Sequence, residues 1–547
     1  MPHFGLELNM KDAARGLLLL FFLYRSCVLL HRLFLSRLAK FPGPRLAAAS
    51  SWYEAFFDLR SANFPDVLQS LHSRYGPIVR VNPWELSILD PDFYDSVYVS
   101  AAKRRTTLIA GARAGLGMSG RPRILVRPKG TGTTDEPDAI STTSSHEVHR
   151  MRRKAVEGFF SKQSVIRMES RIHDEVSSLE DKLRSLDATG TVVRLDHAFT
   201  CVTGDLAGLF AAGENPRLLE APDFNPEWHD SVMGILSVVP YVRNFPWINS
   251  VLGVIPLWLL QKLNPRAAGF RAFHLVRLPF RLLCVRRLTC ISGTQLCGRR
   301  VAEVKADIAS KSELKESDKT SIFHHILQSD VPESEKAPDR MRREAFALLA
   351  AGTITTASTV SLITFYVLAD PAVEKRLRQE LHFVADALPE KLPRWTDLEK
   401  LPYLTACIKE GLRLSRFFRR SPRISPDHEI QYKQWTIPKN TPVGMSICHM
   451  LMDPDVYPDP HEFKPERWIG DVDARVHRNF VPFVRGSRNC LGLNLAWAEM
   501  YIILGVLFRP GGHKMSLDCD ESDMVLVHDS DVGIPKTGSR GLRVRFE

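Results

Sequence analysis

Residues 483–492 read FVRGSRNCLG, and residues 493–508, LNLAWAEMYIILGVLF, follow directly with the apolar pattern of a helix. A cysteine binds a metal well only as its thiolate, so the surroundings of Cys490 decide whether it can serve. Arg485 and Arg488 lie close to it in the sequence, and the amino terminus of the next helix carries partial positive charge. The stretch therefore predicts a metal site with a cysteine thiolate ligand.

Two glycines of this stretch, Gly486 and Gly492, lack side chains where we expect the backbone to approach a flat macrocycle. The pattern FxxGxRxCxG resembles the signature of the cytochrome P450 family. The resemblance implies a mainly α fold with small β-sheets. It also implies haem b (iron protoporphyrin) between an oxygen-binding helix and the cysteine loop, with a thiolate that supports cleavage of the oxygen–oxygen bond. The residues that match the signature are Phe483, Gly486, Arg488, Gly492 and, as the axial ligand, Cys490.

A second motif, Glu410-Gly411-Leu412-Arg413, places opposite charges one helical turn apart. Side chains at this spacing share one face of a helix, so we expect a buried salt bridge between Glu410 and Arg413. The resemblance implies that Arg467, in the segment PERW, is a third member and that the three hold the cysteine loop in place. Without Cys490 downstream, the pair alone would be typical of an ordinary helix surface.

The segment HRMRR, from His149 to Arg153, begins a predicted helix that ends near Ser161. His149 and Arg153 stand at positions i and i+4, which presents two donors on one face. The resemblance implies that they bind the two haem propionates, and that Arg488 and Arg423 complete the set of donors.

Residues 344–368, EAFALLAAGTITTASTVSLITFYVL, form a predicted helix that is too apolar for the surface. Gly352 and several threonines interrupt it, although glycine costs about 1 kcal/mol inside a helix and threonine hydroxyls compete for backbone hydrogen bonds. Their presence indicates a compensating gain elsewhere. The resemblance implies that Ala351 and Gly352 leave room for dioxygen over the haem and that Thr355 helps to deliver protons to it.

One position departs from the family pattern. The family usually has Asp or Glu directly before the threonine, and this chain has Ile354. Loss of a carboxylate from the proton relay favours the first of two alternatives to a monooxygenase that depends on a reductase. One is a haem-thiolate enzyme that uses peroxide or rearranges its substrate, and the other is a non-catalytic haem-binding sensor.

The amino-terminal residues 1–40 are predicted to form a membrane anchor and the approach to a hinge. Residues 16–30 are apolar, and basic residues follow them, which places the main domain in the cytosol by the positive-inside rule. The run is short for a bilayer core, which needs about 20 apolar residues, so a tilted span and an interfacial helix both remain open. Pro42 and Pro44 end the helix, and residues 41–547 are predicted to form one catalytic domain at the endoplasmic reticulum membrane.

The composition is that of a globular protein, with 44% apolar and 25% charged residues and a formal net charge of +11. The chain has no basic stripe interleaved with aromatic residues and no zinc-finger signature, which argues against nucleic-acid binding. Nine irregularly spaced cysteines indicate a reducing compartment. We interpret Arg150 and Arg152 as a solvated basic face.

Apolar periodicity predicts helices over 373–387 and 401–414, and β-hairpins over 78–89 and 431–437. Residues 119–145, rich in Gly, Thr, Ser and Pro, are predicted to be a loop. Residues 276–300 are basic and lack clear periodicity, which favours a variable insertion or an intron retained in the gene model.

These observations together predict a membrane-anchored monooxygenase that inserts one oxygen atom from O2 into an apolar substrate. The resemblance implies an NADPH-dependent flavoprotein reductase as electron donor, and basic residues near the cysteine suit an acidic docking surface. Residues 75–100 and 421–446 resemble filamentous-fungal members of secondary metabolism, near trichodiene oxygenase. This resemblance implies a terpenoid or polyketide-like substrate that is hydroxylated or epoxidised.

Overall fold

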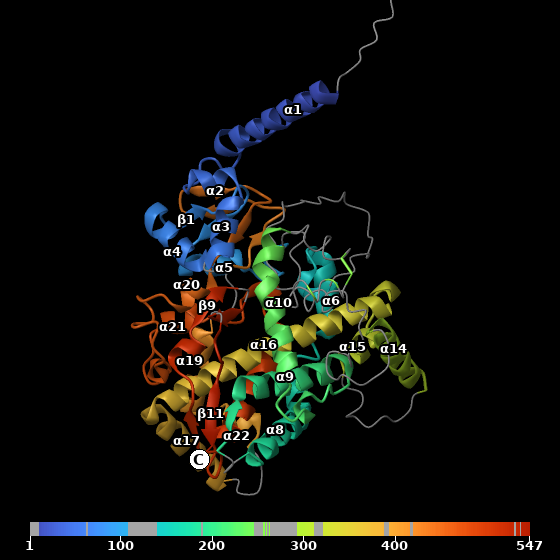
Figure 1. The fold of residues 1–547 in the computed structure, drawn as a ribbon, viewed down its shortest axis with the longest axis vertical. Coiled ribbons are helices and arrows are strands. Elements are labelled where there is room, and N and C mark those ends of the chain that lie inside the picture. The colour runs from blue at the N-terminus through green and yellow to red at the C-terminus, as the bar shows by residue number, and fades with distance from the viewer. Residues whose placement is uncertain are drawn as a thin grey trace, which may run out of the picture.

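The computed structural model describes residues 10–61, 64–107, 139–186, 190–245, 255–256, 259, 262, 293–310, 321–387, 393–415, 420–529, 532–536 and 538–546. Helices make up most of these residues, and short strands form small sheets between them (Figure 1). This architecture agrees with the predicted fold class. The helices and their bounds are α1 Met10–Leu30, α2 Arg45–Ala49, α3 Trp52–Ser61, α4 Phe64–Tyr75, α5 Tyr94–Val97, α6 His146–Val156, α7 Lys162–Arg167, α8 Glu169–Arg184, α9 Leu195–Ala212, α10 Pro226–Asn244, α14 Gly293–Ser310, α15 Ile322–Gln328, α16 Pro338–Ala369, α17 Pro371–Ala387, α18 Trp395–Leu398, α19 Pro402–Leu414, α20 Ile447–Leu451, α21 Ala474–Asn479, α22 Leu493–Phe508 and α23 Glu521–Met524.

A four-stranded sheet in the order β1-β2-β7-β4 lies beside the amino-terminal helices. Strands β1 and β2 are antiparallel with Ile78 opposite Ile88, and β5 and β6 are antiparallel with Ile430 opposite Ile437, so both predicted hairpins are confirmed. The strands are β1 Ile78–Arg80, β2 Leu86–Ile88, β3 Val192–Arg194, β4 Arg423–Ile424, β5 Ile430–Tyr432, β6 Trp435–Ile437, β7 Pro442–Gly444, β8 Met515–Leu517, β9 Leu526–Asp529, β10 Gly533–Pro535 and β11 Arg543–Phe546.

The long helix α16 passes through the helical body and packs against α9, α19 and α22 (Figure 1). The contact with α9 is close, because the Thr203 hydroxyl donates to the Thr353 carbonyl oxygen at 2.8 Å. A Cβ atom on Gly352 would lie 3.1 Å from the Cβ of Ala207. The glycine in this apolar helix is therefore explained by the packing of α16 on α9.

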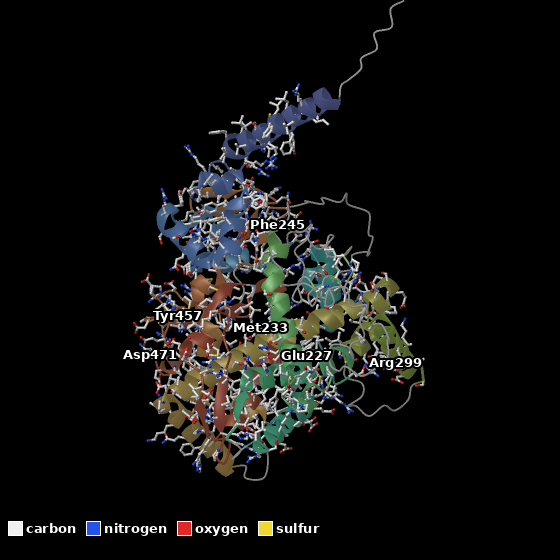
Figure 2. All side chains as sticks on the ribbon, viewed as in Figure 1. Glu227, Met233, Phe245, Arg299, Tyr457 and Asp471 are labelled. Atoms are coloured by element: carbon white, nitrogen blue, oxygen red, sulfur yellow. The ribbon has the colours of Figure 1, made fainter. Side chains whose placement is uncertain are left out.

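Helix α10 runs from α9 to the amino-terminal elements, and Glu227, Met233 and Phe245 mark its course in Figure 2. At its far end, the Phe245 ring lies 5.2 Å from the Trp52 ring of α3, measured between centroids. Helix α10 thus connects the helical body to the part of the molecule that carries α3 and the first sheet.

The apolar amino-terminal run forms α1, which projects away from the body (Figure 1). By length and composition alone, two helices of the described residues are able to cross a membrane, Ala13–Leu35 and Pro338–Ala369. The first is not buried in the molecule, whereas the second is the core helix α16.

The proline segment after α1 is attached to the body through Arg80 of β1, which is 2% exposed. The Arg80 backbone N–H donates to the Pro42 carbonyl oxygen at 2.7 Å, and its guanidinium donates to the Arg32 carbonyl oxygen at 2.9 Å. A Cβ atom on Gly43, at φ +154°, would lie 2.5 Å from the Arg80 carbonyl oxygen. Only glycine lets the chain pass β1 this closely.

The irregular stretches lie partly outside the described residues. Residues 119–138 and 276–292 are outside them, so the predicted loop is tested only at its end, where Ile140–Thr142 form one 3₁₀ turn. Residues 293–300 belong to α14, which the sequence did not predict as helical. The helix predicted to end near Ser161 ends at Val156 in α6, followed by a turn in which the Phe159 N–H donates to the Val156 carbonyl oxygen at 3.0 Å.

The contact between α16 and α19 gives a test of this core. A Cβ atom on Gly411 would lie 2.8 Å from the Cδ1 of Ile363, which is fully buried. We expect Gly411→Ala to lower the free energy of unfolding, because overpacking costs about 1–3 kcal/mol and the better helix propensity of alanine returns only about 1 kcal/mol. Gly234→Ala in α10 is the matched control, since nothing lies within 4 Å of that position. A Gly411→Ala variant as stable as the parent in chemical denaturation would refute this packing.

Candidate functional site

The cysteine loop between α21 and α22 is closed by backbone hydrogen bonds. The Cys490 N–H donates to the Phe483 carbonyl oxygen at 2.9 Å, and the Ser487 N–H donates to the Val99 carbonyl oxygen at 3.0 Å. Gly486 has φ +80°, and a Cβ atom there would lie 2.6 Å from the Val99 carbonyl oxygen. Gly486 therefore lets the loop approach the 98–99 backbone, whereas the predicted reason was approach to a macrocycle. Gly492 has open space at its Cβ position, and its predicted approach to a flat macrocycle stays a prediction.

The Cys490 side chain is accessible to solvent yet enclosed by protein. Burial raises the pKa of the thiol, while a hydrogen bond from the Gly492 N–H and the charge of Arg153 act in the opposite direction. Neither Arg485 nor Arg488, which were predicted to favour the thiolate, is among the groups that shift the pKa of the Cys490 thiol. Arg485 pairs with Asp95 at 3.3 Å, and Arg488 donates to the Thr143 carbonyl oxygen at 2.6 Å. Phe483 packs near the Trp497 ring of α22, with ring centroids 6.2 Å apart.

The four predicted propionate donors act on one another electrostatically. Burial lowers the pKa of His149 to about 2, and the charges of Arg488, Arg153 and Arg423 add to this effect. Arg153 donates to the Asn489 carbonyl and side-chain oxygens at 2.8 and 2.7 Å, and the nearly buried Arg423 donates to the Ser421 carbonyl oxygen at 2.8 Å. These acceptors are neutral, so the cluster carries excess positive charge, as a site for two carboxylates requires. The donor set therefore fits a haem.

Arg152 does not lie on a solvated face, which corrects the interpretation from the sequence. It is 3% exposed and pairs with Glu335 at 2.8 Å, and Glu335 also binds Arg340 at 3.0 Å. Arg340 reaches Glu344 at the start of α16 at 2.6 Å. The network links α6 to α16, and only Arg150 of the two is exposed. The sequence did not reveal the burial of Arg152, because this residue stands in a run of basic residues and has the same type as its neighbours.

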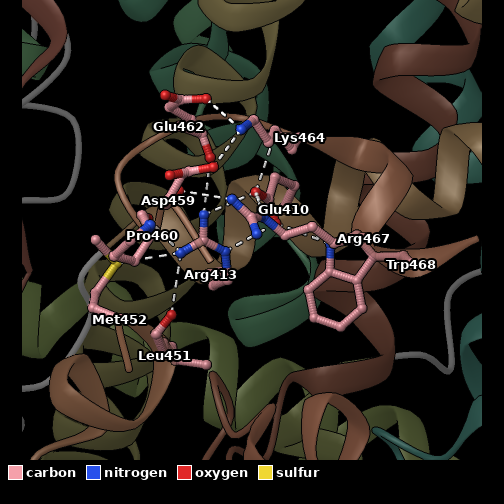
Figure 3. A network of polar contacts seen from close by, with 10 residues as sticks. All are labelled: Glu410, Arg413, Leu451, Met452, Asp459, Pro460, Glu462, Lys464, Arg467 and Trp468. Carbon is pink, nitrogen blue, oxygen red and sulfur yellow. Dashed lines mark hydrogen bonds and ion pairs between the residues drawn. The ribbon is translucent and has the colours of Figure 1, made fainter. Parts of the chain in front are cut away.

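The predicted Glu410–Arg413 salt bridge is confirmed and is completely buried (Figure 3). The two groups form paired hydrogen bonds of 2.9 and 2.8 Å, and Arg467 donates to Glu410 at 3.1 Å. Trp468 and the Lys464 backbone N–H also donate to this carboxylate, each at 3.0 Å. The remaining donors of Arg413 bind the carbonyl oxygens of Leu451, Pro460 and Glu462 at 3.2, 2.6 and 3.1 Å.

The residues predicted to lie beside dioxygen are in the middle of α16. There Ala351 is exposed, although most of the surrounding helix is buried. The Thr355 hydroxyl donates to the Ala351 carbonyl oxygen at 2.8 Å. Ile354 is 6% exposed and offers no proton. The packing on α9 explains the lack of a side chain at Gly352, whereas the predicted roles of Ala351 in making room for dioxygen and of Thr355 in proton delivery stay predictions.

Sequence reasoning missed Glu499, which is 2% exposed in α22. Its side chain forms a hydrogen bond with Thr356 of α16, and burial raises its pKa to about 8. The available signal was a single acidic residue in a helix that is otherwise almost entirely apolar.

One further group of metal-ligating side chains occurs among the described residues, formed by Asp196, His197 and His229. Arg194 donates to both carboxylate oxygens of Asp196, at 2.8 and 2.6 Å. A guanidinium already neutralises this carboxylate, which therefore attracts a cation only weakly.

The buried ion pair makes a quantitative prediction. We expect Arg413→Met to lower the free energy of unfolding by about 3 kcal/mol or more, because a buried carboxylate that loses one partner is strongly destabilising. Arg475→Ala, which breaks an exposed pair with Asp473, is the control and should change stability far less, because solvent screens the two charges. Thermal denaturation of both variants measures the difference. Equal effects would mean that the buried pair has no special weight.

The model of the family "Cytochrome P450" matches residues 290–522. The chain is 40% identical to "Cytochrome P450 monooxygenase sdnH" of Sordaria araneosa, over 98% of this chain and 95% of the relative. It is 38% identical to "Fusicoccadiene C-8 hydroxylase" of Phomopsis amygdali, over 95% of this chain and 93% of the relative. It is 37% identical to "Stellatic acid synthase" of Emericella variicolor, over 96% and 94%. The predicted family and enzyme class are thereby confirmed: this chain belongs to the cytochrome P450 family, whose members are monooxygenases that hold haem through a cysteine thiolate.

Proposed function

We propose that the chain is a membrane-anchored monooxygenase in which Cys490 is the axial thiolate ligand of haem b. The observation that carries this proposal is the accessible Cys490 thiol in a closed loop, beside a cluster of cations with neutral hydrogen-bond acceptors. A haem would take its two propionates to that cluster and its iron to the sulfur. When bound, it supplies the metal at which dioxygen is cleaved.

The residues of the chain have separate tasks in this proposal. His149, Arg153, Arg423 and Arg488 bind the propionates and so orient the macrocycle. The network around Glu410 keeps the segment that precedes the cysteine loop in place. Ala351 leaves space on α16, and the Thr355 hydroxyl holds a proton beside that space.

We propose an apolar terpenoid as the substrate, with hydroxylation or epoxidation in a fungal biosynthetic pathway as the reaction. The names of two relatives support this choice, since one is a fusicoccadiene hydroxylase and the other a stellatic acid synthase. A polyketide-like substrate is the alternative within the same class. Either substrate would gain free energy on binding as its apolar surface leaves water.

We further propose that α1 anchors the enzyme in the endoplasmic reticulum membrane, with residues 41–547 as a cytosolic catalytic domain. The electron donor in this arrangement is an NADPH-dependent flavoprotein reductase bound to the same membrane. The exposed apolar surface of α1 and the basic balance of the chain support this assignment. An anchor shared by both proteins raises the frequency of their encounters.

The ligand assignment is tested by the difference spectrum of the reduced protein with carbon monoxide. We expect the parent to give the absorption band typical of a thiolate ligand and Cys490→His to lose it, because imidazole donates less charge to iron. Cys407→Ser serves as a matched control, since that cysteine is buried in α19 and free. A thiolate spectrum retained by Cys490→His would exclude Cys490 as the ligand.

A second experiment separates the proposed reaction from its rival, a peroxide-using or rearranging enzyme, which Ile354 favours by removing an acid from the oxygen side. Membranes containing the chain and a reductase are given apolar terpenes with NADPH or with peroxide alone. We expect product only with NADPH and O2. Equal product without NADPH would replace the proposed function by the rival, and binding without any product would indicate a haem-binding sensor.

A further inference from the structure

Arg423 of β4 is a buried cation, and no carboxylate pairs with it in the part of the chain that the structure describes. It is 4% exposed, and its Nη1 donates to the Ser421 carbonyl oxygen at 2.8 Å and to the Ser421 hydroxyl oxygen at 2.7 Å. Its other nitrogens make no hydrogen bond with the described residues. A buried charge needs compensation, and these nitrogens are available to the propionate that we assign to Arg423.

An aromatic ring lies beside the Arg423 guanidinium. The guanidinium carbon is 5.0 Å from the centroid of the Tyr98 ring. The face of an aromatic ring carries partial negative charge and attracts a cation, and the attraction is stronger where water is excluded. Tyr98 is 2% exposed, so solvent screens this contact little. The ring therefore compensates part of a charge that no carboxylate balances.

The Tyr98 side chain is fixed by its hydroxyl group. The hydroxyl donates to the Met445 carbonyl oxygen at 3.1 Å and accepts from the Met445 N–H at 3.0 Å. Met445 directly follows β7, and in β7 Val443 lies opposite Arg423 of the antiparallel neighbour β4. The ring is thus attached to the strand next to the one that carries the cation, which keeps it beside Arg423.

A second buried ring connects Tyr98 to the cysteine loop. Tyr94 of α5 stacks on Tyr98 with ring centroids 4.4 Å apart and an angle of 28° between the planes. The Arg485 guanidinium carbon lies 5.9 Å from the Tyr94 centroid. The carbonyl oxygen of the residue after Tyr98, Val99, accepts a hydrogen bond from the cysteine loop at 3.0 Å. One short segment therefore contacts both the cysteine loop and Arg423.

We propose that Tyr98 is a positioning residue for haem binding. Its ring holds the Arg423 guanidinium in place for a propionate, and its stack on Tyr94 ties that guanidinium to the cysteine loop. This inference rests on the proposed function, which assigns Arg423 to a propionate. A guanidinium that is already in place loses little freedom when its ligand binds, and such preorganisation increases affinity. In this role Tyr98 acts through Arg423.

The central experiment measures the rate at which the purified holoprotein loses haem to an excess of apomyoglobin. We expect Tyr98→Leu to raise this rate by about 10-fold, which corresponds to about 1.4 kcal/mol and lies in the range of a cation–π contact shielded from water. Tyr98→Phe should stay close to the parent, because it loses the hydroxyl group but keeps the ring face. An unchanged rate in Tyr98→Leu would contradict the inference.

Tyr432→Leu is the matched control. Tyr432 is also 2% exposed, belongs to the same apolar cluster as Tyr98, and has a cation, Lys433, at 5.2 Å from its ring centroid. Lys433 is not one of the proposed propionate donors. We therefore expect Tyr432→Leu to lower the stability of the fold without faster loss of haem. Equally fast loss in Tyr432→Leu and Tyr98→Leu would mean general damage to this cluster and would refute a positioning role.

A double-variant cycle tests whether Tyr98 acts through Arg423. Arg423→Met should raise the rate of haem loss, and Tyr98→Leu added to it should raise the rate no further. A further rise of about 10-fold in the double variant, or an unchanged rate in Arg423→Met, would exclude this route of action.

A second substitution keeps the test decisive if Tyr98→Leu does not fold. Pentafluorophenylalanine at position 98 nearly keeps the shape of phenylalanine, but its fluorine atoms withdraw the electrons that make the ring face negative. Haem loss about 10-fold faster than in Tyr98→Phe would support the inference. Equal rates in these two variants would overturn it.

The outcomes separate this inference from the proposed function. Parent protein without the carbon monoxide spectrum of a thiolate ligand would overturn both. A parent that has this spectrum, with haem loss that neither Tyr98→Leu nor Arg423→Met changes, would overturn the positioning role alone and leave Cys490 as the ligand.

Discussion

The buried ion pair between Glu410 and Arg413 is the interaction on which the site depends. Neither side chain is exposed, so the carboxylate must be satisfied entirely by protein donors, and Arg467 and Trp468 provide them. Arg413 in turn holds carbonyl oxygens of the segment that leads toward the cysteine loop. A charge removed from water tolerates little displacement, because each lost partner leaves a desolvated charge. The buried pair on α19 therefore holds the segment that precedes Cys490 in a fixed position.

The site then combines two electrostatic environments that neighbouring elements keep apart. On the α6 side, cations gather around His149 with neutral acceptors, and this surplus positive charge fits a dianionic macrocycle. On the α16 side, apolar burial dominates, and the acid at Glu499 stays neutral for lack of a cation. Burial raises the pKa of the Cys490 thiol, so the proposed thiolate would depend on metal binding.

In the apolar helix α16, the role of a single residue can be interpreted only when its contacts with neighbouring helices are known. Its glycine at 352 fits the close approach of Ala207, and four of its hydroxyls donate to carbonyl oxygens of the same helix. Thr356 contacts Glu499 of α22. The glycine and threonines of this helix, which we interpreted from the sequence as a sign of function, thus have two causes. One is packing against α9, and the other is polar chemistry near Ala351 and Thr355.

The sequence by itself determined the family, the helical fold class, both hairpins and the Glu410–Arg413 pair, because each depends on spacing along one element or on a short motif. The tertiary structure alone decided the partners of residues far apart in the chain. Arg152 proved to be buried against Glu335, Arg485 and Arg488 to bind Asp95 and backbone oxygens, and Glu499 to meet Thr356. Burial and charge compensation arise only when distant elements pack together, so periodicity along the chain carries no record of them.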